Sequence, residues 1–360
     1  MAEDTQQLRE AIDALDDRLV ALLHERAELA SRIGALKQTT DQATYVPARE
    51  RDVLERVAAL AGEGRLRPEH LIAIYREVIS ACRAVEQPLR VAYFGPAATF
   101  THQAAIGRFG NAAELIPVET IPDVFAETQR NHADYGVVPV ENSTEGPVHP
   151  TLDTFIDSDL KIRSEIMLPI RLHILSRTTL DAVRTVYTNP VAFGQCRQWV
   201  ARNLPGRAIV EVVSTARAAL TAAEDPSGAA VAPELAAAEY GLDVIARDIQ
   251  DLSSNYTRFY VIGQPEQSVP TGRDKTAVAF SIRDHVGALR DAADVFARRS
   301  INLSSIQSRP SRRRAWDYVF FVELAGHEVD LILAEALVEL NRQCAFVKVL
   351  GSWPDERPPI

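Results

Sequence analysis

The sequence is short of cysteine, positive charge and long apolar runs, and each shortage excludes a class of protein. Its three cysteines, Cys82, Cys196 and Cys344, are far apart and form no CxxC pair. We therefore expect neither disulfides nor a zinc site, with a reducing cytoplasm as the default compartment. The net charge of −10 argues against nucleic acid or an anionic membrane as partner. No apolar run approaches the ~18 residues of a membrane span, and the acidic, polar N-terminus does not resemble a signal peptide.

The first 87 residues have the pattern of an all-helical domain. Apolar residues recur every three or four positions from about residue 5 to residue 38, which predicts one helix near 50 Å long at ~1.5 Å per residue. Such a helix cannot bury its apolar stripe in a small monomer, so we expect a partner helix from a second chain. Prolines at 47 and 68 open two further predicted helices, to about residues 60 and 85.

Two other domains follow. Residues 89–266 alternate short β-branched runs with helical ones, which indicates an α/β domain with ligands at the strand ends. Residues 265–272 have the composition of a linker, and residues 274–353 show the order βαββαβ of a ferredoxin-like module. We therefore predict a multidomain protein with domains at 1–87, 89–266 and 274–353.

The segment 255–259 (NYTRF) is the most informative candidate site. Thr257 is a hydroxyl beside the guanidinium of Arg258 and between two aromatic rings, where a predicted strand begins. A proton donor, a carboxylate clamp and a water-excluding wall suit the chemistry of a small anionic ring. Alone, the segment is weak evidence, because most such threonines are edge-strand residues. Arg258 could equally form an internal salt bridge.

On the first predicted helix, Arg26 and Lys37 lie eleven residues apart. At ~100° per residue they fall within about 20° of each other on one face, so they could hold a substrate with two carboxylates. The alternative is solvated surface charge. The stretches 8–13 (LREAID), 22–30 (LLHERAELA), 34–37 (GALK) and 47–51 (PARER) resemble the helical chorismate mutase family. This resemblance implies binding and orienting roles for Arg9, Arg26, Lys37, Arg49 and Glu50, with Arg9 reaching into the site of a dimer partner.

The mutase-like domain departs from its family at three positions. Val46 stands where an acid is frequent, Cys82 where a binding serine is frequent, and Glu86 where a catalytic glutamine is frequent. Only a protonated Glu86 could donate to the breaking ether oxygen. We therefore expect a raised pKa for Glu86 and mutase activity that falls as pH rises. A silent mutase domain is the alternative.

The α/β region resembles prephenate dehydratase along nearly its whole span, which implies a two-lobed α/β (periplasmic-binding-protein-like) fold. The matching segments are 95–102 (GPAATFTH), 138–146 (VPVENSTEG), 187–190 (YTNP) with Gln195, 214–216 (STA) and 255–259. The implied catalytic residues are Thr257, Glu141, Asn142 and Gln195. The implied substrate-binding residues are Thr99, Thr101, Thr188, Ser214, Thr215, Asn255, Arg258 and Phe259. The hydroxyl residues that begin helices could instead be ordinary caps, and Glu141 acting through a water is the alternative proton donor to Thr257.

The C-terminal module resembles the ACT domain through the segments 287–290 (GALR) and 308–310 (SRP). The resemblance implies effector binding at Gly287, Ala288, Leu289, Ser308, Arg309 and Pro310. Arg290 and Gln307 depart from the usual residues, and a purely structural dimerisation module is the alternative.

Together the resemblances imply an enzyme that rearranges chorismate to prephenate and converts prephenate to phenylpyruvate. Phenylalanine is the expected allosteric ligand, and the expected assembly is a homodimer or higher oligomer. No metal or organic cofactor is implied. A non-catalytic amino-acid-sensing protein is the alternative from another class.

Overall fold

The computed structural model describes residues 5–40, 45–85, 87–252, 254–266, 268–283, 285–311 and 318–355, with only the backbone of 37–40. The chain divides into two compact units. One contains residues 1–90 with 108–114, and the other contains 91–107 with 115–360. In the described ranges no helix is both long enough and apolar enough to cross a bilayer.

The first unit is built on three helices, as predicted: α1 (Thr5–Thr40), α2 (Pro47–Ala61) and α3 (Pro68–Ala84). A proline occupies the first turn of both α2 and α3, where the missing N–H costs no helical hydrogen bond. Leu54 and Val57 of α2 are buried, whereas the apolar positions of α1 from Leu8 to Ile33 are largely exposed. The length and the exposed stripe of α1 agree with the sequence-based expectation.

The second unit begins with a lobe built on a mixed sheet in the order β2-β1-β3-β11-β5. Its strands are β1 (Arg90–Phe94), β2 (Glu114–Val118), β3 (Tyr135–Asn142), β5 (Lys161–Pro169) and β11 (Tyr256–Gly263), and the short β4 (Gly146–Pro147) also pairs with β3. The helices of this lobe are α4 (Phe100–Phe109), α5 (Ile121–Gln129) and α6 (His149–Asp157). Strand β1 is parallel to β3, and β11 is antiparallel to both β3 and β5.

The second lobe contains a separate sheet in the order β10-β6-β9-β7-β8. Its strands are β6 (His173–Ser176), β7 (Thr185–Thr188), β8 (Ala208–Glu211), β9 (Gly228–Ala232) and β10 (Asp243–Ala246). Its helices are α7 (Pro190–Asn203), α8 (Thr215–Glu224), α9 (Leu235–Tyr240) and a 3-10 turn at Leu180–Ala182.

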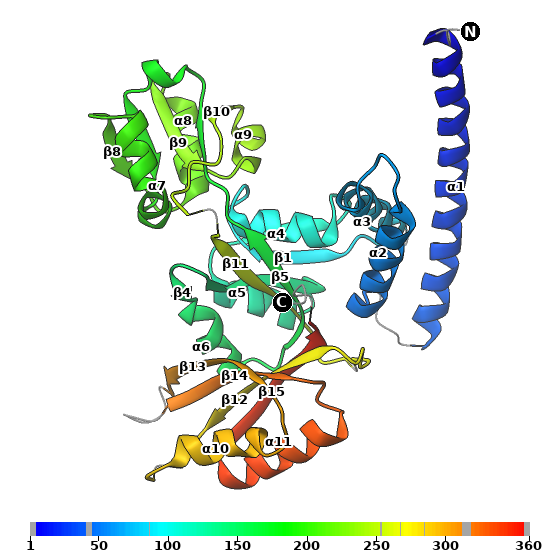
Figure 1. Ribbon diagram of the computed structural model, residues 1–360, viewed down its shortest axis with the longest axis vertical. Coiled ribbons are helices and arrows are strands. Elements are labelled where there is room, and N and C mark those ends of the chain that lie inside the picture. Colours follow the sequence, from blue (N-terminus) through cyan, green and yellow to red (C-terminus); the bar gives the residue numbers. More distant parts are fainter. Residues whose placement is uncertain are drawn as a thin grey trace. The chain divides into compact units, whose positions relative to one another are not determined.

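Two segments connect the lobes, one from β5 to β6 and one from β10 to β11 (Figure 1). They lie side by side: the Ile170 N–H donates to the Asn255 carbonyl at 2.8 Å, and the Ile249 N–H donates to the Leu172 carbonyl at 2.8 Å. Because the chain crosses twice, strand β11 of the first lobe begins where the second lobe ends. The predicted two-lobed α/β architecture is therefore confirmed.

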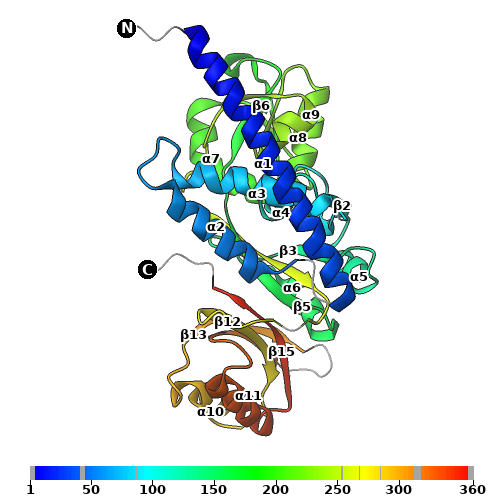
Figure 2. The ribbon, with the colours of Figure 1, turned by 90° about the vertical axis from the view of Figure 1, so that its right-hand side faces the viewer.

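The C-terminal domain has the βαββαβ order that the sequence predicts. It comprises β12 (Asp274–Ser281), α10 (Ala288–Ala297), β13 (Leu303–Pro310), β14 (Tyr318–Ala325), α11 (Leu331–Gln343) and β15 (Phe346–Pro354). The sheet order β13-β14-β12-β15 is that of a ferredoxin-like fold. Both helices lie on one face of the sheet (Figure 2), and Val295, Phe296 and Leu340 are buried between the layers.

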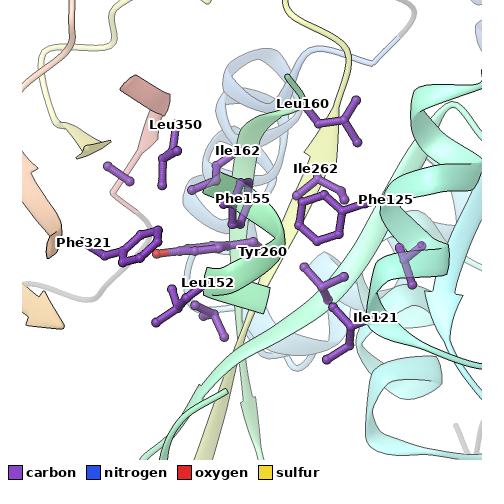
Figure 3. Packing of buried hydrophobic residues seen from close by; sticks show 14 of the residues in the cluster. Ile121, Phe125, Leu152, Phe155, Leu160, Ile162, Tyr260, Ile262, Phe321 and Leu350 are labelled. Atoms are coloured by element: carbon purple, nitrogen blue, oxygen red, sulfur yellow. The ribbon is translucent and has the colours of Figure 1, made fainter. Parts of the chain in front are cut away.

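The other face of this sheet packs against the first lobe. Phe321 and Leu350 share one buried cluster with Phe155 and Tyr260 (Figure 3). Trp353 belongs to the same cluster. The Tyr260 and Trp353 ring centroids are 5.4 Å apart in an edge-to-face contact. The two layers meet closely at Gly351, where a Cβ would lie 2.4 Å from the Ile162 carbonyl oxygen, so no larger residue fits.

Candidate active sites

The register between β11 and β3 decides which residues of the 255–259 segment face one another. Thr257 lies opposite Asn142, and Arg258 lies opposite Glu141. Because successive side chains of a strand point to opposite faces, these two pairs serve different surroundings. Thr257 and Asn142 line a cleft, whereas Arg258 and Glu141 line a different pocket on the side of the ferredoxin-like domain.

Asn142 is held in one orientation by the turn that follows it. Its Oδ1 accepts hydrogen bonds from the backbone N–H groups of Thr144 (2.9 Å) and Glu145 (3.1 Å) and from the Thr144 hydroxyl. A backbone N–H can only donate, so the oxygen must face the turn and Nδ2 must face the other way. Asn142 Nδ2 then donates to Thr257 Oγ1 at 2.8 Å and to Asn255 Oδ1 at 3.0 Å.

The chain of amides continues into the second lobe. Asn255, 2% exposed, uses its Nδ2 to donate to Gln195 Oε1 at 2.9 Å. With its oxygen occupied in this way, Gln195 presents N–H donors. We call Asn142, Asn255 and Gln195 the amide relay. Its two ends present the Thr257 hydroxyl proton and the Gln195 amide protons as donors.

The cleft between the lobes has an empty volume of about 1110 Å³, measured out to its open mouth. Besides Thr257, Asn142 and Gln195, the predicted residues that line it are Thr99, Thr101, Ser214, Thr215 and Phe259. Thr99 and Ser214 also cap helices, because Thr99 Oγ1 accepts from the His102 N–H (3.3 Å) and Ser214 Oγ accepts from the Arg217 N–H (3.1 Å). Thr99 and Ser214 therefore both cap a helix and line the cleft. Helix starts carry positive potential, which suits an anion.

Thr188 lies outside the cleft lining. It is fully buried, and its hydroxyl donates to the Asn189 carbonyl at 3.1 Å. Asn189, which we did not select from the sequence, caps α7 through Ala192 N (2.8 Å) and lines the cleft in its place. Thr188 is the buried last residue of β7, whereas Asn189 lies one residue beyond the strand as the N-cap of α7.

Arg258 takes part in an internal salt-bridge network. Its Nη2 lies 3.0 Å from Glu141 Oε2, and its Nη1 lies 2.5 Å from Glu323 Oε1 and 3.5 Å from Glu165 Oε2. Burial lowers the pKa of Arg258, but the neighbouring Tyr260, Glu323 and Glu165 raise that pKa by a larger amount. The net shift is upward, so the guanidinium stays charged. The structure therefore favours the internal salt bridge over a substrate clamp. Glu141 lines the pocket beside the ferredoxin-like domain, whereas Thr257 lines the cleft, and the water-mediated alternative stays a prediction.

The first unit contains its own pocket between its helices, with an empty volume of about 820 Å³ out to its open mouth. Four predicted residues line it: Arg26, Arg49, Glu50 and Cys82, together with Val46. Arg83 and Tyr45, which we did not select, line it as well. Arg83 Nη2 lies 3.1 Å from Glu50 Oε2, and the Arg83 guanidinium lies 5.3 Å from the centre of the Tyr45 ring.

The remaining mutase-like positions are separate from this pocket or outside the described residues. Arg9 lies on the same helix as Arg26 but about 25 Å along the axis, at ~1.5 Å per residue. It is exposed and belongs to none of the pocket lining. The side chain of Lys37 and all of Glu86 lie outside the described residues, so the expectation about the Glu86 pKa stays a prediction.

The predicted effector segments lie at one end of the ferredoxin-like sheet. Gly287 caps α10 with φ +89°, just after β12, and Ala288 and Leu289 open the helix. Ser308 pairs across Phe320 to Phe280 at the end of β12, and Pro310 follows two residues later on the edge strand β13. Arg309 points elsewhere: its Nε and Nη2 lie 2.9 and 3.0 Å from the Asp153 carboxylate of α6.

Fold and sites together define a multidomain protein with a pocket in its helical unit and a cleft between two α/β lobes, and the cleft carries a polarised hydroxyl and amide donors. Comparison with known proteins agrees. Residues 8–87 match chorismate mutase type II, residues 91–267 match prephenate dehydratase and residues 276–342 match the ACT domain.

Similarity also extends over the whole chain. A bifunctional chorismate mutase/prephenate dehydratase from Aquifex aeolicus is 48% identical over 356 residues, covering 98% of each chain. The chain belongs to the family of bifunctional chorismate mutase/prephenate dehydratases.

Two solved structures share the fold of the last two domains. The prephenate dehydratase of Arthrobacter aurescens in complex with L-phenylalanine has a TM-score of 0.70 and 35% identity, covering 75% of this chain and 92% of that one. A structure described as GqqA, a quorum-quenching acylase, has a TM-score of 0.68 and 26% identity, covering 73% and 97%. Since two different activities are described on one fold, function must be argued from the site.

Proposed function

We propose that this chain rearranges chorismate to prephenate in its helical unit and converts prephenate to phenylpyruvate in the cleft between the lobes. The observation that supports the second reaction best is the 2.8 Å hydrogen bond from Asn142 Nδ2 to Thr257 Oγ1. It leaves the Thr257 proton as the group that the hydroxyl offers to the cleft.

The chemistry requires one proton at one place. When the ring carboxylate of prephenate leaves as carbon dioxide, the electrons of the broken C–C bond complete the aromatic ring, and the ring hydroxyl departs. That hydroxyl takes a proton and leaves as water. Thr257 donates this proton and recovers one from solvent, and the Asn142 N–H stabilises the negative charge that develops on Oγ1.

The groups that bind the substrate donate hydrogen bonds to its carboxylate without transferring a proton to it. The Gln195 amide and the starts of α4 and α8 supply N–H and hydroxyl donors for a carboxylate. Amide donors hold the departing carboxylate without protonating it, so it stays ionised until it leaves. Phe259 helps to exclude water from the ring.

The pericyclic rearrangement needs no covalent step, so positioning and electrostatics suffice. Arg26 and Arg49 line one pocket and would hold the carboxylates of chorismate. Arg9 completes the site of a second chain in a homodimer that buries the exposed stripe of α1.

Phenylalanine is the proposed feedback ligand of the ACT domain. It would bind at the end of the sheet where the segments Gly287 to Leu289 and Ser308 to Pro310 lie. Two ion pairs can carry its effect to the dehydratase lobe, because Glu323 and Arg309 contact Arg258 and Asp153.

The test is to incubate the purified chain with chorismate and, separately, with prephenate, and to follow phenylpyruvate with and without phenylalanine. We expect product from both substrates and inhibition by phenylalanine. Prephenate left unchanged would refute the dehydratase proposal and favour a non-catalytic sensor.

A dehydratase with a silent mutase domain is the second candidate. It is favoured by the 3.1 Å Glu50–Arg83 ion pair, which occupies a residue expected to orient substrate, and by Val46, Cys82 and Glu86. Under this alternative, prephenate yields phenylpyruvate while chorismate is not consumed.

A further inference from the structure

Helix α7 is broken next to Gln195. Cys196 has φ −130° and ψ 16°, values outside the helical region, between two helical segments. Cys196 is fully buried, and its thiol donates to the Ala192 carbonyl at 3.1 Å. Burial, together with the nearby charge of Asp251, raises the pKa of this thiol to about 12, so the residue is inert packing. Gln195 is therefore the last residue before the break.

Asp251 occupies the break. In a continuous helix the Trp199 N–H would donate to the Gln195 carbonyl four residues earlier. Here the Trp199 N–H donates to Asp251 Oδ1 at 3.1 Å, while the Gln195 carbonyl accepts from the Asp251 N–H at 2.7 Å. The Gln198 N–H donates to the other carboxylate oxygen at 3.0 Å.

This arrangement makes Asp251 a cap supplied by a distant segment. A carboxylate that accepts two N–H groups at the start of a helical segment forms charge-assisted hydrogen bonds and complements the helix dipole. The backbone N–H of Asp251 also donates to the carbonyl of Gln195, the last residue before the break. The backbone of Gln195 is thus fixed on one side by α7 and on the other by Asp251.

The same loop carries the other end of the amide relay. Asp251 precedes Asn255, whose Nδ2 donates to Gln195 Oε1 at 2.9 Å, and the strand with Thr257 follows. One short segment therefore sets both the backbone of Gln195 and the side chain that orients its amide.

We propose that Asp251 is a positioning residue for the dehydratase reaction, and that by capping the broken end of α7 it holds Gln195 where its amide can bind the substrate. This inference rests on the proposed dehydratase function. It assigns Asp251 no contact with substrate.

The experiment compares Asp251→Ala and Asp251→Asn in the wild-type and Gln195→Ala backgrounds of the full chain, with kcat and KM measured for prephenate. We expect Asp251→Ala to lower kcat/KM about 10- to 100-fold, since small misplacements of binding groups cost that much. Asp251→Asn should lose less, because its one amide oxygen still accepts one N–H. In the Gln195→Ala background both changes should cost less than about twofold, because Asp251 acts through the missing group.

Equal losses in both backgrounds, or no loss from Asp251→Ala, would overturn the proposal. The matched control is Asp248→Asn, since Asp248 is a surface acid of the same loop that pairs with Arg171 at 3.0 Å, and it should leave kcat/KM unchanged. Amide hydrogen exchange at Gln198 and Trp199 provides a readout independent of turnover. Exchange should rise in Asp251→Ala, and unchanged protection would also overturn the cap. If wild-type protein forms no phenylpyruvate, the function itself fails, while the exchange result still decides whether Asp251 caps α7.

Discussion

The side-chain amide of Asn142 donates to the hydroxyl oxygen of Thr257 at 2.8 Å, and the N–H groups of Thr144 and Glu145 fix which end of the amide faces that hydroxyl. The two residues come from antiparallel strands far apart in the sequence. The hydrogen bond occupies a lone pair of Oγ1 and leaves its proton for the cleft, which is the arrangement that a proton donor requires.

Removing the Thr257 hydroxyl should nearly abolish dehydratase activity. Thr257→Ala is expected to lower kcat for prephenate by about 100- to 10,000-fold, the range of a lost general acid. Thr257→Ser retains the hydroxyl and should keep far more activity. Chorismate consumption by the same preparations serves as the folding control. Dehydratase activity of Thr257→Ala within a few-fold of wild type would refute the role.

Asn142→Asp tests the direction of the hydrogen bond. One carboxylate oxygen can still accept from the turn, but the other cannot donate to Thr257 and would accept the hydroxyl proton instead. We expect a loss of about 100-fold in kcat, the scale of one lost stabilising donor. A Thr144→Val substitution removes a bond to the same side chain without changing the atom that faces Thr257, so its effect should be much smaller. Equal effects would contradict the assignment.

Glu323→Gln should weaken the junction between the ACT domain and the dehydratase lobe. The Glu323 carboxylate is buried and contacts Arg258 Nη1 and the Tyr260 hydroxyl. Loss of its charge should lower the free energy of unfolding by about 2 kcal/mol and raise the phenylalanine concentration needed for half-inhibition. Glu335→Gln, an exposed acid of α11, is the control. The coupling role fails if inhibition is unchanged.

Stability should fall in mild acid because of His102. Burial lowers the pKa of His102 from its ordinary 6.5, an effect that Glu239 partly offsets, and His102 Nδ1 accepts from the Ala98 N–H at 3.0 Å. Its contribution is complete above pH 6.5 and is lost as pH falls through the lower folded pKa, since the unfolded chain binds the proton first.

The measurement is thermal denaturation between about pH 8 and pH 5, the window of imidazole titration. His102→Asn keeps an acceptor for Ala98 without titrating, so its melting temperature should depend less on pH. His173, whose pKa is also lowered by burial, accounts for a residual slope. The exposed His132 supplies the control, His132→Asn. An unchanged slope in His102→Asn would rule out the contribution.

Subunit mixing tests whether Arg9 serves a partner chain. Arg9→Ala and Arg26→Ala should each lose mutase activity. Hybrid dimers of the two combine both defects in one site and leave the other intact, so about a quarter of the sites should work in an equal mixture. Dehydratase activity should be unchanged throughout. Failure of the mixture to regain mutase activity would place Arg9 outside a shared site.

Much of this fold can be predicted from the sequence because the signals for its helices and strands are local. The apolar period of α1 predicts its length, prolines mark the starts of α2 and α3, and the βαββαβ order predicts the ferredoxin-like domain. Arg83, Asp251 and Glu323 carry no such signal. Each acts through partners from another element, and neither period nor motif places those partners beside them.

The elements, the order of the domains and the kinds of chemistry available can all be predicted from the sequence, because helix period, turn residues and motif identity depend on near neighbours. Which residues act together depends instead on contacts between elements that are distant in the sequence. Strand alternation sends Thr257 to the cleft and the adjacent Arg258 to the salt bridges, and the register of β11 on β3 pairs Thr257 with Asn142 rather than with Glu141. A shift of one residue would reverse both choices, and that register is set by long-range pairing that no local pattern contains.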